Sequence, residues 1–105
     1  MVRGRVSATL GGLAAAVLVV ALPGSAQAAQ GVFQDHQPGN VLEALNNPRD
    51  NQCYTTGNAE GAVENGTNRF AELYEAPGCR GDVVQTVDPG SAVGWAEFKS
   101  VKFTR

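Results

Sequence analysis

The stretch YEAPGCRG, residues 74–81, joins two β-prone segments of the chain. The segment before it, residues 69–74, and the segment after it, residues 82–87, both combine β-branched, aromatic and alternating polar side chains. Proline and two glycines in the stretch predict a tight turn. The stretch also contains one of only two cysteines in the 105-residue chain. We therefore start the interpretation from a short corner between two strands.

Further short β-prone segments lie on both sides of this corner, at residues 52–56 and 98–103. Asn65-Gly66 predicts a two-residue hairpin turn, and Asp88-Pro89-Gly90 predicts a second turn. Residues 41–45 fit either one helical turn or a short strand. Several short strands with turn signals every eight to twelve residues indicate a small all-β sandwich or barrel.

The first 28 residues have the pattern of a secretory signal peptide. Arg3 and Arg5 form a positive start, an apolar run follows over residues 10–22, and Ala26-Gln27-Ala28 supplies a small-x-small cleavage motif. The alternative, a membrane anchor, needs about 20 apolar residues, more than this run provides. We expect cleavage after Ala28 and a secreted, extracellular product without a membrane segment.

The mature chain would then divide into a flexible leader and one domain. Residues 29–40 are expected to be poorly ordered, and residues 41–105 to form a single β domain. Removing Arg3 and Arg5 from the 8 basic residues leaves 6 against 10 acidic ones, a net charge of −4. This balance argues against nucleic acid as a partner, because phosphate binding needs a basic surface.

The two cysteines, Cys53 and Cys79, are expected to form a disulfide, because export places them in an oxidising compartment. Closing a loop of this length should stabilise a small domain by roughly 3–4 kcal/mol. A reactive thiol or a zinc site is the alternative. Two cysteines and a single histidine, His36, do not make a zinc ligand set.

The spacing Tyr74, then Cys79, then Gly81 resembles the folded-hairpin signature of the βγ-crystallin Greek key. Ser100-Val101-Lys102-Phe103 resembles the serine-containing strand that follows it in that family. Residues 41–65 look like a degenerate first motif, with Ala62 in place of the serine. The chain is similar to small secreted crystallin-like proteins of actinobacteria. The resemblance implies a Greek-key sandwich with one nearly complete motif and one degenerate motif.

The resemblance also implies roles for individual residues. Tyr74 would stack on the corner, Gly81 would adopt a backbone conformation closed to other residues, and Ser100 would hydrogen-bond into the corner. A disulfide between Cys79 and Cys53 would tie the second motif to the first. The core would contain Ala71, Leu73, Val101 and Phe103.

Many microbial crystallin-like domains bind calcium through a short acidic or amide motif that ends at the motif serine. Residues 95–99 lack the first two oxygen ligands of that motif, and Lys99 places a positive charge there. Calcium needs six to eight oxygen ligands. We expect no family-type calcium site and no cofactor, while Asn58, Glu60 and Asp88 are the remaining oxygen donors for a weak one.

The residues do not support an enzyme. His36 is the only histidine and falls in the expected leader, so a nucleophile–histidine–acid arrangement would require the leader to dock. We expect a solvated His36 and no catalytic residues.

The resemblance implies a secreted non-enzymatic binding or effector protein, either a protease inhibitor or an antimicrobial toxin-like protein. The alternative is a structural or envelope-associated protein without a specific ligand. The partner would be an extracellular protein or a cell-surface component, and exposed sheet edges would permit a homodimer. Residues 88–95 and 57–61 are the candidate inhibitory loops. Trp95 either caps the core, the reading we favour, or contacts a partner.

Overall fold

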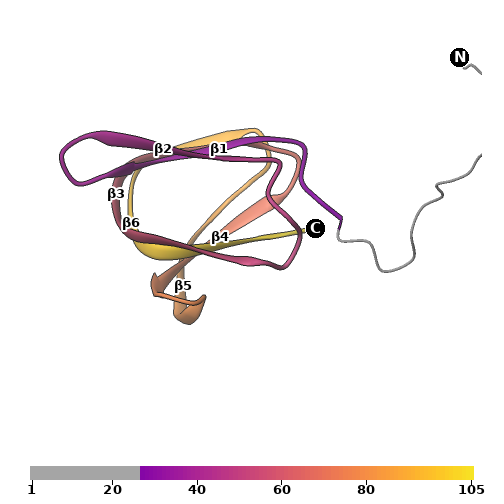
Figure 1. The fold of residues 1–105 in the computed structure, drawn as a ribbon. Helices are drawn as coiled ribbons and strands as arrows, with labels where there is room; N and C mark the ends of the chain where they lie inside the picture. The colour runs from indigo at the N-terminus through magenta and orange to yellow at the C-terminus, as the bar shows by residue number, and fades with distance from the viewer. Residues whose placement is uncertain (1–26) are drawn as a thin grey trace, which may run out of the picture.

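A computed structural model of the chain describes residues 27–105 and is all-β, as predicted. It contains one antiparallel six-stranded sheet with the strand order β2-β1-β3-β6-β4-β5 (Figure 1). The strands are β1 (Gly31–Gln37), β2 (Val41–Asn46), β3 (Cys53–Thr67), β4 (Phe70–Ala76), β5 (Arg80–Val87) and β6 (Ser91–Thr104).

The sheet consists of two units with the same topology. In the first unit, the hairpin β1–β2 is followed by β3, which returns to pair with β1; in the second, β4–β5 is followed by β6, which pairs with β4. Val32 lies opposite Gly66 in the first unit, and Phe70 lies opposite Thr104 in the second. Equivalent residues of the two units are therefore 38 positions apart in the sequence. The long strands β3 and β6 also pair with each other and join the two units into one sheet.

The curled sheet encloses one core, with β1 and β2 on one side and β4 on the other (Figure 1). Phe33 from β1 packs edge-to-face on Phe103 from β6, with 5.2 Å between the ring centroids. Ala71, Leu73, Val101 and Phe103, the predicted core residues of the second unit, are all fully buried, which confirms that prediction. The complete core cluster comprises Phe33, Ala59, Val63, Ala71, Leu73, Val87, Ala96, Phe98, Val101 and Phe103.

The prediction of a flexible leader over residues 29–40 is wrong, because residues 31–37 form β1 between β2 and β3. Phe33 is fully buried and anchors this strand in the core. The first unit therefore begins at β1 and not at residue 41. The predicted signal peptide lies almost wholly outside the described residues.

The predicted turn at Asn65-Gly66 is also wrong, since both residues lie inside β3 and the chain turns at residues 68–69. Asn65 is buried, and its Nδ2 donates to the carbonyl oxygens of Arg69, Val87 and Asp88. A Cβ on Gly66 would lie 2.8 Å from the carbonyl oxygen of Val32. Gly66 thus permits close packing of β3 against β1, and Asn65 satisfies backbone carbonyl groups at the neighbouring turns.

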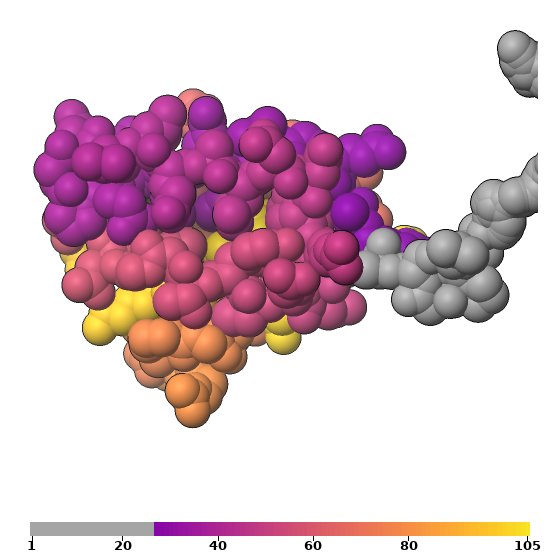
Figure 2. Space-filling model, viewed as in Figure 1, coloured from indigo at the N-terminus to yellow at the C-terminus, as the bar shows by residue number. Residues whose placement is uncertain are grey.

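The second unit follows the sequence more closely. β4 and β5 confirm the two strands predicted around residues 74–81, and the turn at residues 88–90 closes with a hydrogen bond from Ser91 N to Asp88 O at 3.1 Å. β6 extends further back than predicted and includes Trp95. Seven of the eight residues of β5 are exposed, and this segment (orange) projects from the body of the molecule in Figure 2.

Candidate functional site

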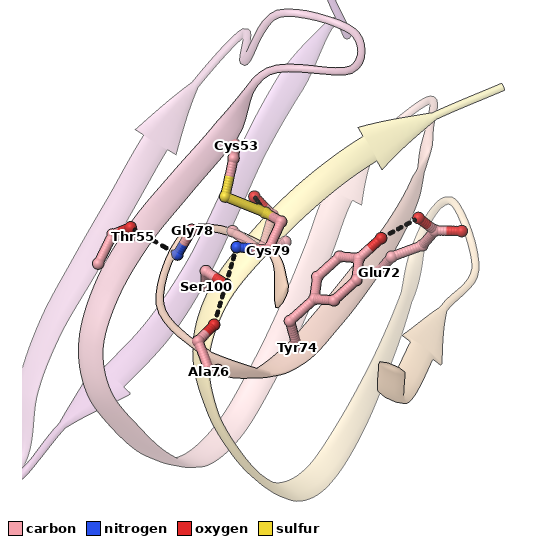
Figure 3. Close-up of a disulfide and its surroundings, with 9 residues drawn as sticks. Cys53, Thr55, Glu72, Tyr74, Ala76, Gly78, Cys79 and Ser100 are labelled. Atoms are coloured by element: carbon pink, nitrogen blue, oxygen red, sulfur yellow. Dashed lines mark hydrogen bonds between the residues drawn. A yellow bond between two sulfur atoms is a disulfide. The ribbon is translucent and has the colours of Figure 1, made fainter. Parts of the chain in front are cut away.

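The β4–β5 hairpin is folded over and held by one side chain of β6 (Figure 3). The Ser100 hydroxyl accepts a hydrogen bond from Cys79 N at 2.8 Å and donates one to Ala76 O at 2.6 Å. Gly78 N donates to Thr55 Oγ1 on β3 at 3.3 Å. The expected role of Ser100 is therefore confirmed, and the hairpin reaches across β6 to β3.

The predicted disulfide between Cys53 and Cys79 is present, with 5.8 Å between the two Cα atoms. It joins the start of β3 to the corner of the second hairpin (Figure 3). This bond links the two units, as expected, and fastens the hairpin at the same place as the hydrogen bond to Thr55.

The corner requires unusual backbone conformations at Gly78, Cys79 and Gly81, whose φ angles are +73°, +56° and +76°. The prediction for Gly81 is thus confirmed, and Cys79 adopts the same region although it carries a side chain. A Cβ on Gly81 would meet the Glu75 side chain at 2.6 Å. Tyr74 is nearly buried, and its hydroxyl donates to Glu72 Oε1 at 3.0 Å (Figure 3).

The first unit has no such corner. The 38-residue shift places Val41 at the position of Cys79, Ala62 at that of Ser100, and Ser91 at that of Cys53. The hydroxyl and both sulfur atoms that hold the second hairpin therefore have no equivalents. Among the described residues, no hydrogen bond joins the tip of the β1–β2 hairpin, residues 38–40, to β6.

A groove lies open beside this tip, with a volume of about 400 Å³. The middle of β3, with Gly61 and Ala62, runs between the first hairpin and β6, which carries Trp95. The complete lining is His36, Gln37, Pro38, Gly39, Asn40, Glu60, Gly61, Ala62, Gly94 and Trp95.

Trp95 is 61% exposed, which corrects the favoured expectation that it caps the core. Trp95 lies on strand β6 and not in a loop. Successive side chains of a strand point to opposite faces, so a shift of one residue moves a side chain from the core to solvent. Its neighbour Ala96 occupies the buried position instead. Among the predicted site residues, Trp95 is the one large side chain that is free to meet a partner.

His36 is half-buried in β1. This corrects the expectation of a solvated histidine in a flexible leader. Its Nδ1 donates to the carbonyl oxygen of Ala62 at 2.8 Å, which fixes the ring against β3. A Cβ on Gly61 would lie 3.2 Å from the Cβ of His36. Glycine at position 61 therefore leaves room for the His36 side chain beside β3.

Two carboxylates face each other at the edge of this groove, where Glu60 belongs to the lining and Glu97 to the adjoining groove. Glu60 on β3 lies directly opposite Glu97 on β6. The Trp95 indole N–H donates to Glu97 Oε2 at 3.3 Å. Within residues 27–105 neither glutamate forms an ion pair, and the nearby Lys99 lines an adjoining groove that also contains both of them.

Sequence reasoning named Glu60 only as an oxygen donor for a weak calcium site. It missed Glu97, because the opposition of Glu60 and Glu97 depends on the β3–β6 register. The two segments considered as inhibitory loops, residues 57–61 and 88–95, lie largely on the paired strands β3 and β6, and Gly61 and Trp95 line the same groove. Asn58 and Glu60 line one groove, whereas Asp88 lies at the turn after β5. In the described part of the chain, no three acidic, histidine or cysteine side chains converge to hold a metal ion.

A third carboxyl is unusual in a different way. Asp35 on β1 is 1% exposed and lies directly opposite Glu43 on β2. Gln37 Nε2 donates to both carboxylates, at 3.5 Å to Asp35 and 3.2 Å to Glu43. Burial, and then the charge of Glu43, raise the pKa of Asp35 to about 6.

Over residues 27–105 the structure has no helix long and apolar enough to cross a membrane. In comparisons with known proteins, no family model, no curated protein and no solved structure matches this chain.

Proposed function

We propose that the chain is a secreted, non-enzymatic binding protein of the βγ-crystallin-like type, which engages an extracellular protein through the face around Trp95. The observation that carries the proposal is the 61% exposure of Trp95 on a paired strand, next to an open groove. A large aromatic side chain on a rigid element loses little entropy on binding, and tryptophan is enriched among the residues that dominate binding energy.

Two observations support the crystallin-like part of the proposal. The two units repeat one topology, a hairpin followed by a strand, with a constant shift, and the second hairpin is folded and held by a serine from the last strand. These features match what the motif of Tyr74, Gly81 and Ser100 implies. The disulfide is compatible with the oxidising environment that secretion would provide.

A protease inhibitor and an antimicrobial toxin-like protein are the two forms of this proposal. In both, the contact would come from the strands β3 and β6 around residues 57–61 and 95, and not from a projecting loop. The alternative is a structural or envelope-associated protein, which predicts no saturable partner. Pairing of the free edges β2 and β5 into a homodimer stays a prediction.

The experiment compares the mature protein with its Trp95→Ala and Val84→Ala variants. Val84 is a matched control, because it is also exposed (44%) but lies on β5, which contributes no residue to the groove beside Trp95. Each protein is assayed at micromolar concentration against purified secreted serine and metalloproteases, and for inhibition of bacterial growth. We expect one activity that Trp95→Ala abolishes and Val84→Ala retains. An activity that survives Trp95→Ala, or no saturable activity at all, would contradict the proposal.

A further inference from the structure

The groove beside Trp95 occupies the place that a folded hairpin covers in the other unit. There, the second hairpin reaches over β6 to β3 and is fastened by Ser100, Thr55 and the disulfide. Beside the first hairpin, Val41 stands at the position of Cys79, Ala62 at that of Ser100, and Ser91 on β6 at that of Cys53. The β1–β2 hairpin continues as an extended ribbon (Figure 1). The chain thus leaves one of two equivalent places uncovered.

We propose that this groove binds a lysine or arginine side chain of the protein partner. The inference rests on the proposed function and names the chemistry of the partner at the same face. The charge of the groove, its aromatic wall and its shape all favour such a side chain.

The charge of the groove favours a cation. Glu60 and Glu97 are directly opposite across β3 and β6, and like charges at such a pair destabilise a sheet. Neither forms an ion pair among the described residues, and Lys99, which lines the adjoining groove with both, makes no ion pair with either of them. A cationic side chain placed between them would remove this repulsion and gain two attractive interactions. The excess of acidic residues in the chain, 10 against 8 basic ones, adds a favourable field.

Trp95 provides the aromatic wall. Its indole N–H points to Glu97, so the hydrogen bond fixes the ring next to the carboxylate while most of the side chain stays exposed. A lysine or arginine head group over an indole face is attracted by the ring quadrupole, and tryptophan is the best of the aromatic residues for this interaction. Beside the second hairpin, the position equivalent to Trp95 is occupied by Gly57 on β3.

The shape of the groove suits one long side chain. Gly61, Ala62 and Gly94 carry little or no side chain, so the space between His36 and Trp95 stays open. The aliphatic part of lysine or arginine can cover such apolar surface while its head group remains at the polar rim. His36 cannot swing into the groove freely, because its Nδ1 is bonded to Ala62 O.

A glycan is the competing ligand for an exposed tryptophan. Neutral sugar hydroxyls can hydrogen-bond to carboxylates, but a neutral sugar leaves the charges of Glu60 and Glu97 uncompensated. The observed pair of opposed carboxylates therefore favours the cation, and the glycan becomes one outcome of the test.

The test uses the indole N–H resonance of the isotope-labelled mature protein, which is unique because the chain has one tryptophan. The probes are the N-acetylated tripeptide amide Gly-Lys-Gly, the same peptide with uncharged norleucine, and the sugar chitotriose. We expect the lysine peptide to shift the resonance saturably and the other two to leave it in place. Glu60→Gln and Glu97→Gln should each weaken lysine-peptide binding by roughly two- to fivefold, the range for one exposed charge pair. Asp82→Asn on β5, the matched control, should not change it.

Equal shifts with the lysine and norleucine peptides, or unchanged binding in both glutamate variants, would overturn the inference. A response to chitotriose alone would assign the groove to glycans and also overturn it, while a binding face at Trp95 would remain. The proposed function fails by a separate result, namely an effector or inhibitor activity that Trp95→Ala leaves intact.

Discussion

Ser100 and Cys79 are joined by a 2.8 Å hydrogen bond from the backbone N–H of Cys79 to the hydroxyl of Ser100. The same hydroxyl donates to Ala76 O, so one side chain satisfies both backbone groups at the neck of the folded hairpin. Ser100 is fully buried, and water cannot take its place without a rearrangement. The position of the hairpin over β6 therefore depends on one hydroxyl and on the disulfide.

Replacing Ser100 with alanine should destabilise the protein by roughly 2–3 kcal/mol, because a buried N–H and a buried carbonyl both lose their partner. Urea unfolding monitored by circular dichroism measures this change. Ser91→Ala removes a hydroxyl from an exposed position of the same strand and should stay within about 0.5 kcal/mol of the parent protein. Equal stabilities of the two variants would show that Ser100 does not hold the hairpin.

The disulfide should contribute a similar amount. Cys53 and Cys79 are 26 residues apart, and a closed loop of that length stabilises by about 3–4 kcal/mol in the chain-entropy model. The Cys53→Ala/Cys79→Ala variant should lose this stability in urea unfolding. Adding a reductant should lower the free energy of unfolding of the parent protein to that of the variant, and should leave the stability of the variant unchanged. A parent protein that is indifferent to the reductant would contradict this expectation.

Alanine substitutions at Gly81 and Gly90 allow the cost of backbone strain to be distinguished from the cost of side-chain crowding. Both have positive φ, +76° and +72°, but a Cβ on Gly90 meets nothing within 4 Å, whereas one on Gly81 meets Glu75 at 2.6 Å. Alanine at Gly90 should cost about 1–2 kcal/mol, the strain of the left-handed conformation. Alanine at Gly81 should cost more, because Glu75 must move and give up its hydrogen bond to Asp82 N. Thermal unfolding of both variants gives the comparison, and an equal cost would mean that the Glu75 contact is immaterial.

The second unit could be predicted from the sequence because its signals are local. The aromatic, the proline and the glycines of residues 74–81 define one hairpin, and Ser100 follows at the spacing expected for its role. The first unit could not be predicted in the same way. Its β1 strand contains Asp35 and His36 at positions that normally indicate solvent, and only the long-range contact of Phe33 with Phe103 reveals it as a core strand.

The candidate site was beyond sequence reasoning for a related reason. Trp95 stood out as a single residue, but its partners Glu60 and Glu97 lie on two strands whose register depends on irregularities in their pairing. A shift of one residue in that register would place one glutamate on the opposite face. The groove itself is open because the first hairpin lacks the disulfide and the serine hydrogen bonds that hold the second. Only the structure allows the two hairpins to be compared in this way.

Asn65 illustrates how a turn signal can be absorbed into a strand, and it leads to a prediction. Its Nδ2 donates to three carbonyl oxygens from a position that is 1% exposed. Asn65→Asp would point a carboxylate at those carbonyls and should cost at least about 2 kcal/mol. Asn58→Asp makes the same change at an exposed position and should have little effect on the urea midpoint. If Asn65 served only as a turn residue, the two variants would behave alike.

Asp35 should make the stability of the protein depend on pH. Its folded-state pKa of about 6 lies above the ordinary value of 3.8, so the folded protein holds this proton more tightly than the unfolded chain. The resulting stabilisation is complete below pH 4 and is lost as the pH rises through 6. Asp35→Asn keeps a neutral side chain at every pH. We expect this variant to match the parent protein closely at pH 4 and to exceed it at pH 8, by up to roughly 2–3 kcal/mol.

The measurement is urea unfolding of both proteins at pH 4, 6 and 8, with the difference between them as the readout, so that other titrating groups cancel. Glu43→Gln provides the control. The charge of Glu43 contributes to the raised pKa of Asp35, and its removal should shrink the difference between pH 4 and pH 8 without abolishing it, because burial is the larger cause. A difference that does not vary with pH would show that folding does not raise the pKa of Asp35.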